Sequence, residues 1–300
     1  KEEIRMKNRR KREVGAKLAL FTAALVWGSS FFIVKDTTDH IPPNFLLAVR
    51  FTLACGALAV LFHRKLRQLT RDDLVKGAVI GLCLFAAYSS QTIGITDTTP
   101  GKNAFLTAVY CVIVPFLFWA VNKTRPDRYH ILAAVLCLAG IGFVSLTEGL
   151  TIRRGDALTL LGGFFYALHM VLVASLGRKK DPIVLSILQF GFAGLFAWMT
   201  TLVSEPRPGA MGIGTVGAVC FLSFGCTAFG LLMQNIGQKY THPAAASIIL
   251  SLESVFGVLF SVLIYGERLT GRLILGFVLI FAAILISETK LSFLKKRKSQ

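Results

Sequence analysis

Runs of about twenty mostly apolar residues recur along almost the whole chain, and only short polar segments separate them. A helix needs roughly 20 such residues to cross the hydrocarbon core of a bilayer. We assign ten runs, at 16–35, 44–62, 74–95, 103–121, 129–146, 156–176, 183–203, 214–238, 244–265 and 272–287. A hydrophobic share of 54% and a charged share of 16% fit this assignment. The sequence therefore predicts an all-α integral membrane protein with ten transmembrane helices.

The net charge of +17 is distributed in a way that predicts orientation in the membrane. With a cytoplasmic N-terminus, 25 lysines and arginines fall on the cytoplasmic side and 7 on the other, while Arg50 lies inside a helix. Cytoplasmic loops carry an excess of these residues, so we expect both termini in the cytoplasm and the chain in the inner membrane. The basic run at 9–12 is expected to set topology and to contact anionic lipids. Nucleic-acid binding by this run is the alternative, and we expect no such partner.

The chain matches itself at two nearly equal offsets, which predicts an internal repeat. At an offset of 139 the matched pairs are Trp27 with Tyr166, Pro43 with Pro182, Phe51 with Phe190 and Ala54 with Ala193. At 143 they are Gln91 with Gln234, Ile93 with Ile236, Gly94 with Gly237 and Pro100 with Pro243. We divide the chain into repeats at 15–147 and 155–288, flanked by basic cytoplasmic segments at 1–14 and 289–300.

Each predicted repeat has five helices, and an odd number makes the second repeat enter the membrane from the opposite side. Inverted repeats of this kind underlie alternating access in many secondary transporters. We therefore expect two inverted five-helix repeats around a central cavity.

Several short segments resemble the two EamA repeats of the drug/metabolite transporter superfamily. They are Trp27-Gly28-Ser29-Ser30, Arg50-Phe51, Gln91-x-Ile93-Gly94, Phe105-Leu106-Thr107-x-x-Tyr110 with Pro115, Leu252-Glu253-Ser254-Val255-Phe256 and Gly266-Glu267-Arg268-Leu269-Thr270. The resemblance covers essentially the whole chain. It implies ten helices around a central cavity and the export or exchange of amino acids, nucleosides or other small metabolites. Ser254 stands where the family pattern has proline, which leaves the substrate open.

Ionisable residues at membrane depth are costly and are the first candidates for function. Glu253 lies about ten residues into its helix, close to the bilayer midplane. It is expected to bind a substrate amine or to exchange a proton; the alternative is a protonated carboxyl that only hydrogen-bonds a neighbouring helix. Tyr110 is its repeat mate and falls at a similar depth. We predict a substrate site at the repeat interface, built from Glu253, Tyr110, Trp27 and Tyr166.

Arg50 and His169 are further candidates for this site. Arg50 needs an anion, carbonyl groups or water as a partner, so it either binds a substrate carboxylate or ties helices together. His169 either lines the cavity and titrates near neutral pH, or is a packed core histidine. Gln91 and Gln234 either bridge helices or line gates. Glu267 is expected at the outer end of its helix in an ion pair with Arg268.

These patterns favour a secondary transporter that moves a small amphipathic metabolite, with coupling protons as a further partner. A passive facilitator or a drug exporter of the same fold is the alternative, and an intramembrane enzyme or a scaffold is less favoured. The six cysteines read as small buried hydrophobes, and we expect no metal, no cofactor and no enzymatic activity. Substrate, direction, coupling and oligomeric state stay open, and the ten-helix unit is compatible with a monomer.

Overall fold

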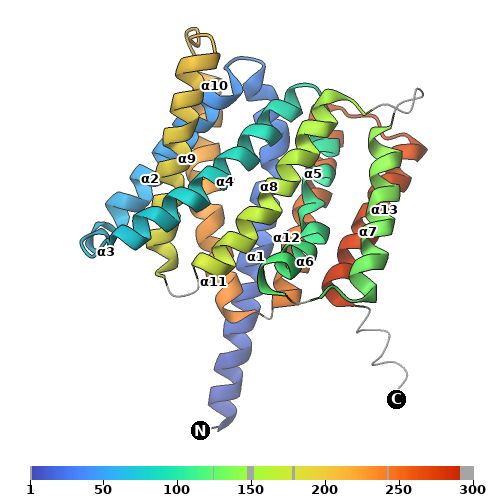
Figure 1. Ribbon diagram of the computed structural model, residues 1–300, viewed down its shortest axis with the longest axis horizontal. Helices are drawn as coiled ribbons and strands as arrows, with labels where there is room; N and C mark the ends of the chain where they lie inside the picture. The colour runs from blue at the N-terminus through green and yellow to red at the C-terminus, as the bar shows by residue number, and fades with distance from the viewer. Residues whose placement is uncertain (1, 124, 147–151, 178–179, 242, 291–300) are drawn as a thin grey trace.

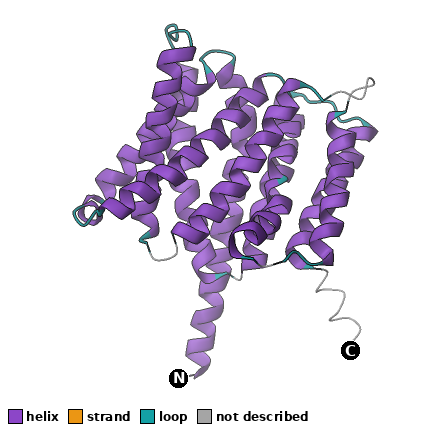
Figure 2. Cartoon of the chain, in the orientation of Figure 1, coloured by secondary structure: helices purple, strands orange, loops and turns teal. Residues whose placement is uncertain are grey.

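The computed structural model describes residues 2–123, 125–146, 152–177, 180–241 and 243–290, and Figure 2 shows them almost entirely as helix. The helices are α1 (Glu2–Thr38), α2 (Pro43–Leu61), α3 (His63–Leu66), α4 (Arg71–Thr96), α5 (Pro100–Ala108), α6 (Tyr110–Asn122), α7 (Arg128–Ser145), α8 (Arg154–Leu176), α9 (Pro182–Ser204), α10 (Ile213–Cys220), η1 (Phe221–Phe229), α11 (Gly230–Tyr240), α12 (Pro243–Phe260), η2 (Ser261–Tyr265) and α13 (Gly271–Thr289).

Within the described residues, nine helical spans are long and apolar enough to cross a membrane. The remaining predicted span corresponds to α12 with η2, where the stretch Ile249–Tyr265 is a shorter apolar helix. The predicted all-α membrane fold is therefore confirmed, and the spans follow one another in the predicted order.

Helix starts are encoded locally by proline and by capping side chains. Proline occupies the first turn of α2, α5 and α9, where its missing N–H would have no helical partner. Thr70 and Asp127 cap α4 and α7 with reciprocal side-chain and backbone hydrogen bonds. These signals explain why the loops are short and why most helix boundaries lie close to the predicted ones. Helix α1 is the exception, because it begins at Glu2 and includes nearly all of the basic segment predicted at 1–14, well before the span predicted at 16–35.

Three spans differ from the continuous α-helices that their apolar pattern predicts: the ninth ends in the π-helix η2, and the fourth and the eighth are irregular in their interior. The fourth is divided at Val109 into α5 and α6, shortly before Pro115, which cannot donate a backbone hydrogen bond inside the helix. The eighth passes from α10 through the π-helix η1 into α11. Both irregular stretches face the centre of the bundle, where π-helical turns are frequently associated with function.

The two halves of the chain pack across each other and share one bundle. Helix α4 packs on α8, and its repeat mate, formed by α10, η1 and α11, packs on α1. Helix α1 packs on α12, and the repeat mates of these two, α8 and the pair α5 and α6, also pack together. The pairs α2 with α9, α5 with α12 and α7 with α13 join repeat mates directly. A pseudo-two-fold axis produces this pattern. It converts each contact of the first kind into an equivalent contact elsewhere, and it converts each contact between repeat mates into itself.

Glycine contacts support the same alignment at the level of single atoms. A Cβ added to Gly94 would lie 2.7 Å from the Gly155 carbonyl oxygen, so α4 and α8 touch through backbone. A Cβ added to Gly237 would lie 2.9 Å from the Ala16 carbonyl oxygen, on α11 and α1. Gly94 aligns with Gly237 at an offset of 143, and Ala16 with Gly155 at 139. The internal repeat predicted from the sequence is therefore confirmed.

Figure 1 shows the beginning of α1 and the end of α13 on one side of the bundle, and α10 at the opposite side. We call these the terminus side and the far side. The connections around α3, between α6 and α7 and between α8 and α9 lie on the terminus side. The connections between α4 and α5 and between α9 and α10 lie on the far side.

Candidate functional site

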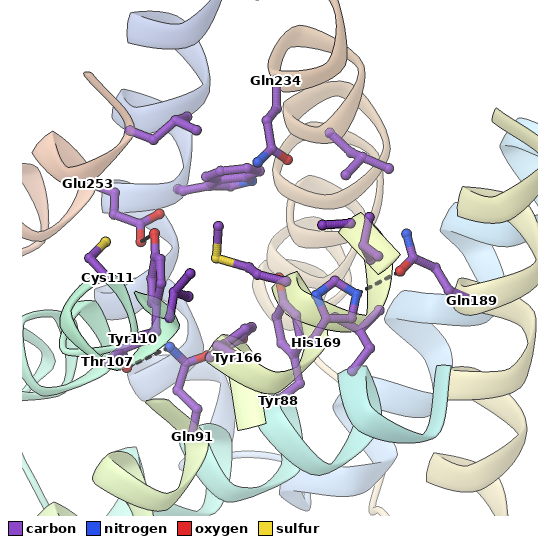
Figure 3. A pocket seen from close by; sticks show the side chains of 18 of the residues that line it. Tyr88, Gln91, Thr107, Tyr110, Cys111, Tyr166, His169, Gln189, Gln234 and Glu253 are labelled. Carbon is purple, nitrogen blue, oxygen red and sulfur yellow. Dashed lines mark hydrogen bonds between the residues drawn. The ribbon is translucent and has the colours of Figure 1, made fainter. Parts of the chain in front are cut away.

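A cavity of about 900 Å³ lies at the centre of the bundle, and Figure 3 shows part of its lining. Both repeats contribute residues to it. All six candidate residues border this one cavity: Trp27, Arg50, Tyr110, Tyr166, His169 and Glu253. Residues from five different spans thus meet at one place, although their role in binding stays a prediction. The volume is within the range of small-molecule sites in proteins.

The cavity opens toward the terminus side. Arg125, His130 and Lys290 border it there, on the α6–α7 connection, on α7 and at the end of α13. Asp127 accepts an ion-pair contact from Lys290 at 2.8 Å, which ties this connection to α13. Partial burial raises the pKa of Asp127, but hydrogen bonds from Lys290 and from the His130 backbone outweigh it, and the net pKa lies below its ordinary value.

Glu253 and Tyr110 form the centre of the site. The Tyr110 hydroxyl donates to Glu253 Oε1 at 3.2 Å, and the Glu253 side chain is almost fully buried. The two are repeat mates at the 143 offset, so contact between them is expected close to the pseudo-two-fold axis. Figure 3 shows this pair at one side of the cavity, with His169 and Gln189 at the other.

Arg50 is held by two other spans. Its Nε donates to the Thr227 hydroxyl at 2.7 Å, and its guanidinium lies 5.0 Å from the centre of the Tyr88 ring. The residue is buried, yet it still borders the cavity. Arg50 therefore ties α2 to η1 and α4, and its remaining N–H groups are close enough to the cavity to meet an anionic group.

The aromatic and amide side chains form hydrogen bonds between helices. Gln91 donates to the Thr107 hydroxyl and accepts from the Tyr166 hydroxyl, both at 2.9 Å, so it joins α4, α5 and α8. The Trp27 indole donates to the Cys226 carbonyl oxygen at 2.6 Å. Gln91 thus has the bridging geometry that the sequence suggested, and its mate Gln234 also borders the cavity.

His169 lies beside an amide that the sequence did not single out. Its Nε2 is 2.8 Å from Gln189 Oε1, which requires the tautomer with hydrogen on Nε2. Gln189 is the repeat mate of Arg50 at the 139 offset, and His169 is the mate of Ser30.

The far side of the cavity is closed by polar contacts around the connection between α4 and α5. The Glu267 carboxylate accepts hydrogen bonds from the Thr99 and Ser261 hydroxyls and, at 3.0 Å, from the Gly101 N–H. The predicted ion pair with Arg268 is wrong, because no salt bridge among the described residues involves Glu267, whose oxygens are taken by these donors. On the other flank, Asp156 accepts from Thr98 and pairs with Lys102 at 3.2 Å. We call this set of contacts the far-side seal.

Several cavity residues were missed by sequence reasoning. Asn103, Thr107, Gln189 and Thr227 border the cavity and hydrogen-bond to predicted residues or their neighbours. Neutral polar residues are frequent in membrane helices, so their presence in the sequence does not indicate that they line a cavity. Among these four, only Gln189 could have been found from the sequence, because it aligns with Arg50 in the repeat. Within the described residues, no cluster of histidine, cysteine, aspartate or glutamate could hold a metal ion.

Comparison with known proteins bears on what this cavity serves. The model of the EamA-like transporter family matches residues 15–146 and again 153–289. An uncharacterized transporter of Archaeoglobus fulgidus is 34% identical over 90% of this chain and 85% of its own length. The uncharacterized inner membrane transporter YedA of Escherichia coli K12 is 24% identical over 92% of this chain and 91% of its own. Protein PecM of Dickeya dadantii is 23% identical over 93% and 94%.

A solved crystal structure shares the fold. It superposes with a TM-score of 0.67 at 16% sequence identity, over 93% of this chain and 98% of that chain. Together, the two matches to the family model, the relatives named as transporters and the central cavity confirm the resemblance first read from the motifs, and this chain belongs to the EamA-like transporter family.

Proposed function

We propose that this chain is a secondary transporter that moves a small amphipathic metabolite carrying an amine, such as an amino acid, by alternating access. In this proposal the protein lies in the cytoplasmic membrane with both termini in the cytoplasm. The cavity then opens to the cytoplasm, and the far-side seal closes it to the outside. The transporter class follows from the family; the solute class and mechanism are what we propose.

The observation that carries the proposal is the chemical polarity of the cavity. Glu253 on α12 offers a carboxyl group at one side, and within the described residues Tyr110 is its only hydrogen-bond partner. On another side Arg50 offers guanidinium N–H groups, because in the part of the chain that the structure describes only its Nε forms a hydrogen bond. Aromatic rings of Trp27, Tyr88 and Tyr166 line the space between. A zwitterion with an apolar side chain matches such a cavity, with its ammonium toward Glu253 and its carboxylate toward Arg50.

The repeat supplies a route for alternating access. Because the halves make equivalent contacts in exchanged positions, a second arrangement with the terminus side closed and the far side open is structurally related to this one. Glu253 and Tyr110 lie beside the pseudo-two-fold axis, so both arrangements keep them at the centre. A solute bound there is therefore reached from either side in turn.

Flux measurements in proteoliposomes test this proposal. Flux of each member of a panel of labelled amino acids is measured with and without an imposed pH gradient. The proteins compared are wild type, Glu253→Gln, Glu253→Ala and the control Asp39→Asn. If Glu253 binds the amine or carries a proton, Glu253→Gln keeps the fold but loses pH-dependent flux, because the amide cannot ionise. Asp39→Asn removes an exposed carboxylate outside the cavity and should transport normally.

Thermal unfolding of the same variants separates binding from a structural role. If Glu253 only ties helices, Glu253→Gln transports normally, whereas Glu253→Ala is destabilised because the Tyr110 hydroxyl loses its partner. Normal and still pH-dependent flux in Glu253→Gln removes the residue from the mechanism. Absence of flux for every amino acid in wild type rejects the proposed solute class.

A further inference from the structure

Asn103 is the polar residue at the closed end of the cavity. It lies in the first turns of α5, and its side chain is fully buried where α4, α5 and α8 meet. The Asn103 Nδ2 donates to the Gln91 carbonyl oxygen at 3.2 Å and to the Thr159 hydroxyl oxygen at 2.8 Å. These bonds are part of the contact between α5 and α8 that closes the far side.

The two ends of the Asn103 amide can be told apart by its partners. The Gln91 carbonyl only accepts hydrogen bonds, and the Thr159 hydroxyl already donates to the Gly155 carbonyl oxygen at 2.7 Å. Both partners therefore require the amide nitrogen, and a flipped amide would face two acceptors. The Oδ1 atom is left over, and it has no hydrogen-bond partner among the described residues. Buried acceptors are rarely left unpaired, so this atom needs an explanation.

Helix packing does not explain the residue. In the repeat alignment, Asn103 matches Ala246 and Thr159 matches Leu20, so the second half has apolar residue types at the equivalent positions. A crossing of this kind therefore forms without an amide. The neighbouring Gln91 amide donates to Thr107 and accepts from Tyr166, and its second N–H makes no hydrogen bond to Asn103 Oδ1.

We propose that Asn103 Oδ1 accepts a hydrogen bond from the N–H of the transported solute and thereby selects solutes with an ammonium group over those that lack N–H. This inference rests on the proposed function and makes Asn103 a specificity-determining residue. The bond from Nδ2 to Thr159 joins α5 to α8, so opening of the far-side seal separates these helices and frees Oδ1. A solute that enters or leaves on that side then contacts Asn103 Oδ1, and it can pair with this acceptor only if it carries a hydrogen-bond donor.

A pair of amphipathic solutes tests this selection. The probes are L-leucine and N,N,N-trimethyl-L-leucine, or the same pair built on whichever amino acid wild type moves fastest. Both members carry a positive charge at nitrogen, but only the first has N–H donors. The measured quantity is the ratio of their half-saturation concentrations for flux in proteoliposomes, which does not depend on how much protein has folded.

Asn103→Leu removes the acceptor but keeps the number and branching of the side-chain heavy atoms, so steric exclusion of the methyl groups is retained. We expect wild type to favour the N–H solute by about tenfold to a hundredfold, the effect of one hydrogen bond to a charged donor, and Asn103→Leu to lower this ratio to about threefold or less. Asn103→Ala, the residue type found at position 246, gives the same test if the leucine variant does not fold. Thr159→Val is the matched control, because it removes the partner of Nδ2 but keeps Oδ1; it should discriminate like wild type.

Two results contradict the inference in different ways. If Asn103→Leu or Asn103→Ala discriminates as strongly as wild type, Oδ1 does not contact the solute, although the proposed function stands. If wild type moves no amino acid at all, the proposed function fails and this inference fails with it.

Discussion

At the scale of single residues, Glu267 shows how a family motif acts through hydrogen bonding. Its carboxylate binds two hydroxyls and one backbone N–H from the α4–α5 connection and from η2. A Cβ at Gly101 would lie 2.5 Å from Glu267 Oε2, so the glycine is needed for this close approach. The motif therefore closes the far side by satisfying donors that would otherwise be buried without partners.

The loss of stability caused by a substitution at Glu267 should increase with the number of hydrogen-bond donors that it leaves unpaired. We expect Glu267→Ala to lower the free energy of unfolding by about 2–4 kcal/mol, and Glu267→Gln to have a smaller effect, because the amide keeps one acceptor oxygen. Arg268 is exposed, so Arg268→Ala should change stability by less than about 0.5 kcal/mol. Thermal unfolding in detergent measures all three. A loss in Arg268→Ala as large as in Glu267→Ala would restore the ion pair that the sequence suggested.

Residue-level prediction succeeded where chemistry and repeat symmetry agreed. Glu253 and Tyr110 were placed together because both are predicted at the same depth of the membrane and align with each other, and their hydrogen bond confirms the contact. Asn103 and Thr227 were missed, since an amide or hydroxyl in a membrane helix is compatible with packing, solvation or binding. Their contacts with the site depend on which helices pack beside them, and this packing cannot be derived from a single sequence.

At the scale of elements, the two halves share a turn before their last helices. The motif that begins at Gly266 indicates this turn in the second half, but the first half has lysine at the equivalent position. Gly266 ends η2 with a φ of 78°, and its repeat mate Lys123 ends α6 with a φ of 59°. Four residues later, Thr270 and Asp127 cap the next helices. Both connections therefore use one left-handed residue followed by a capping side chain. Glycine adopts the left-handed conformation without strain, whereas lysine does not.

This shared turn predicts opposite effects for two substitutions. Lys123→Gly should raise the free energy of unfolding by about 0.5–1 kcal/mol, because relief of left-handed strain exceeds the added chain entropy. Gly266→Ala should lower it by about 1 kcal/mol for the same reason. No other atom lies within 4 Å of a Cβ placed at Gly266, so backbone strain alone is tested there. Unfolding midpoints that move in the same direction for both variants would contradict the shared turn.

Element boundaries were predictable because proline and capping residues mark them, but the interior of the spans was not. The break at Val109 and the π-helix η1 occur in runs whose apolar pattern fits a regular helix. In η1 the Thr227 hydroxyl donates to the Leu222 carbonyl oxygen at 2.9 Å while its oxygen accepts from Arg50. The irregular turn is stabilised by a partner on another span, which local sequence patterns do not contain.

At the scale of the whole molecule, interleaved packing makes each half depend on the other. The terminus side is held by ion pairs that are exposed or half-buried: Lys65 with Asp181 at 2.6 Å is exposed, and Lys180 with Asp73 at 2.8 Å is half-buried. The far side is held by buried carboxylates and close backbone contacts. Exposed pairs contribute little to stability, whereas breaking buried ones is costly. This difference in the strength of the two closures explains why the cavity opens toward the terminus side.

Orientation in the membrane follows from the distribution of lysine and arginine along the sequence, and labelling of single cysteines tests it. In a background without native cysteines, Arg67→Cys lies on a terminus-side connection and Gly209→Cys on a far-side connection, and both positions are exposed. The excess of lysine and arginine on the terminus side predicts that an impermeant thiol reagent labels Arg67→Cys only in inside-out vesicles and Gly209→Cys only in intact cells. Ala174→Cys borders the cavity and is exposed, so it should react from the same side as Arg67→Cys, and more slowly when a transported solute fills the cavity. Labelling of Arg67→Cys in intact cells would reverse the orientation. Labelling of Ala174→Cys only together with Gly209→Cys would instead mean that the protein in the membrane rests with its far side open.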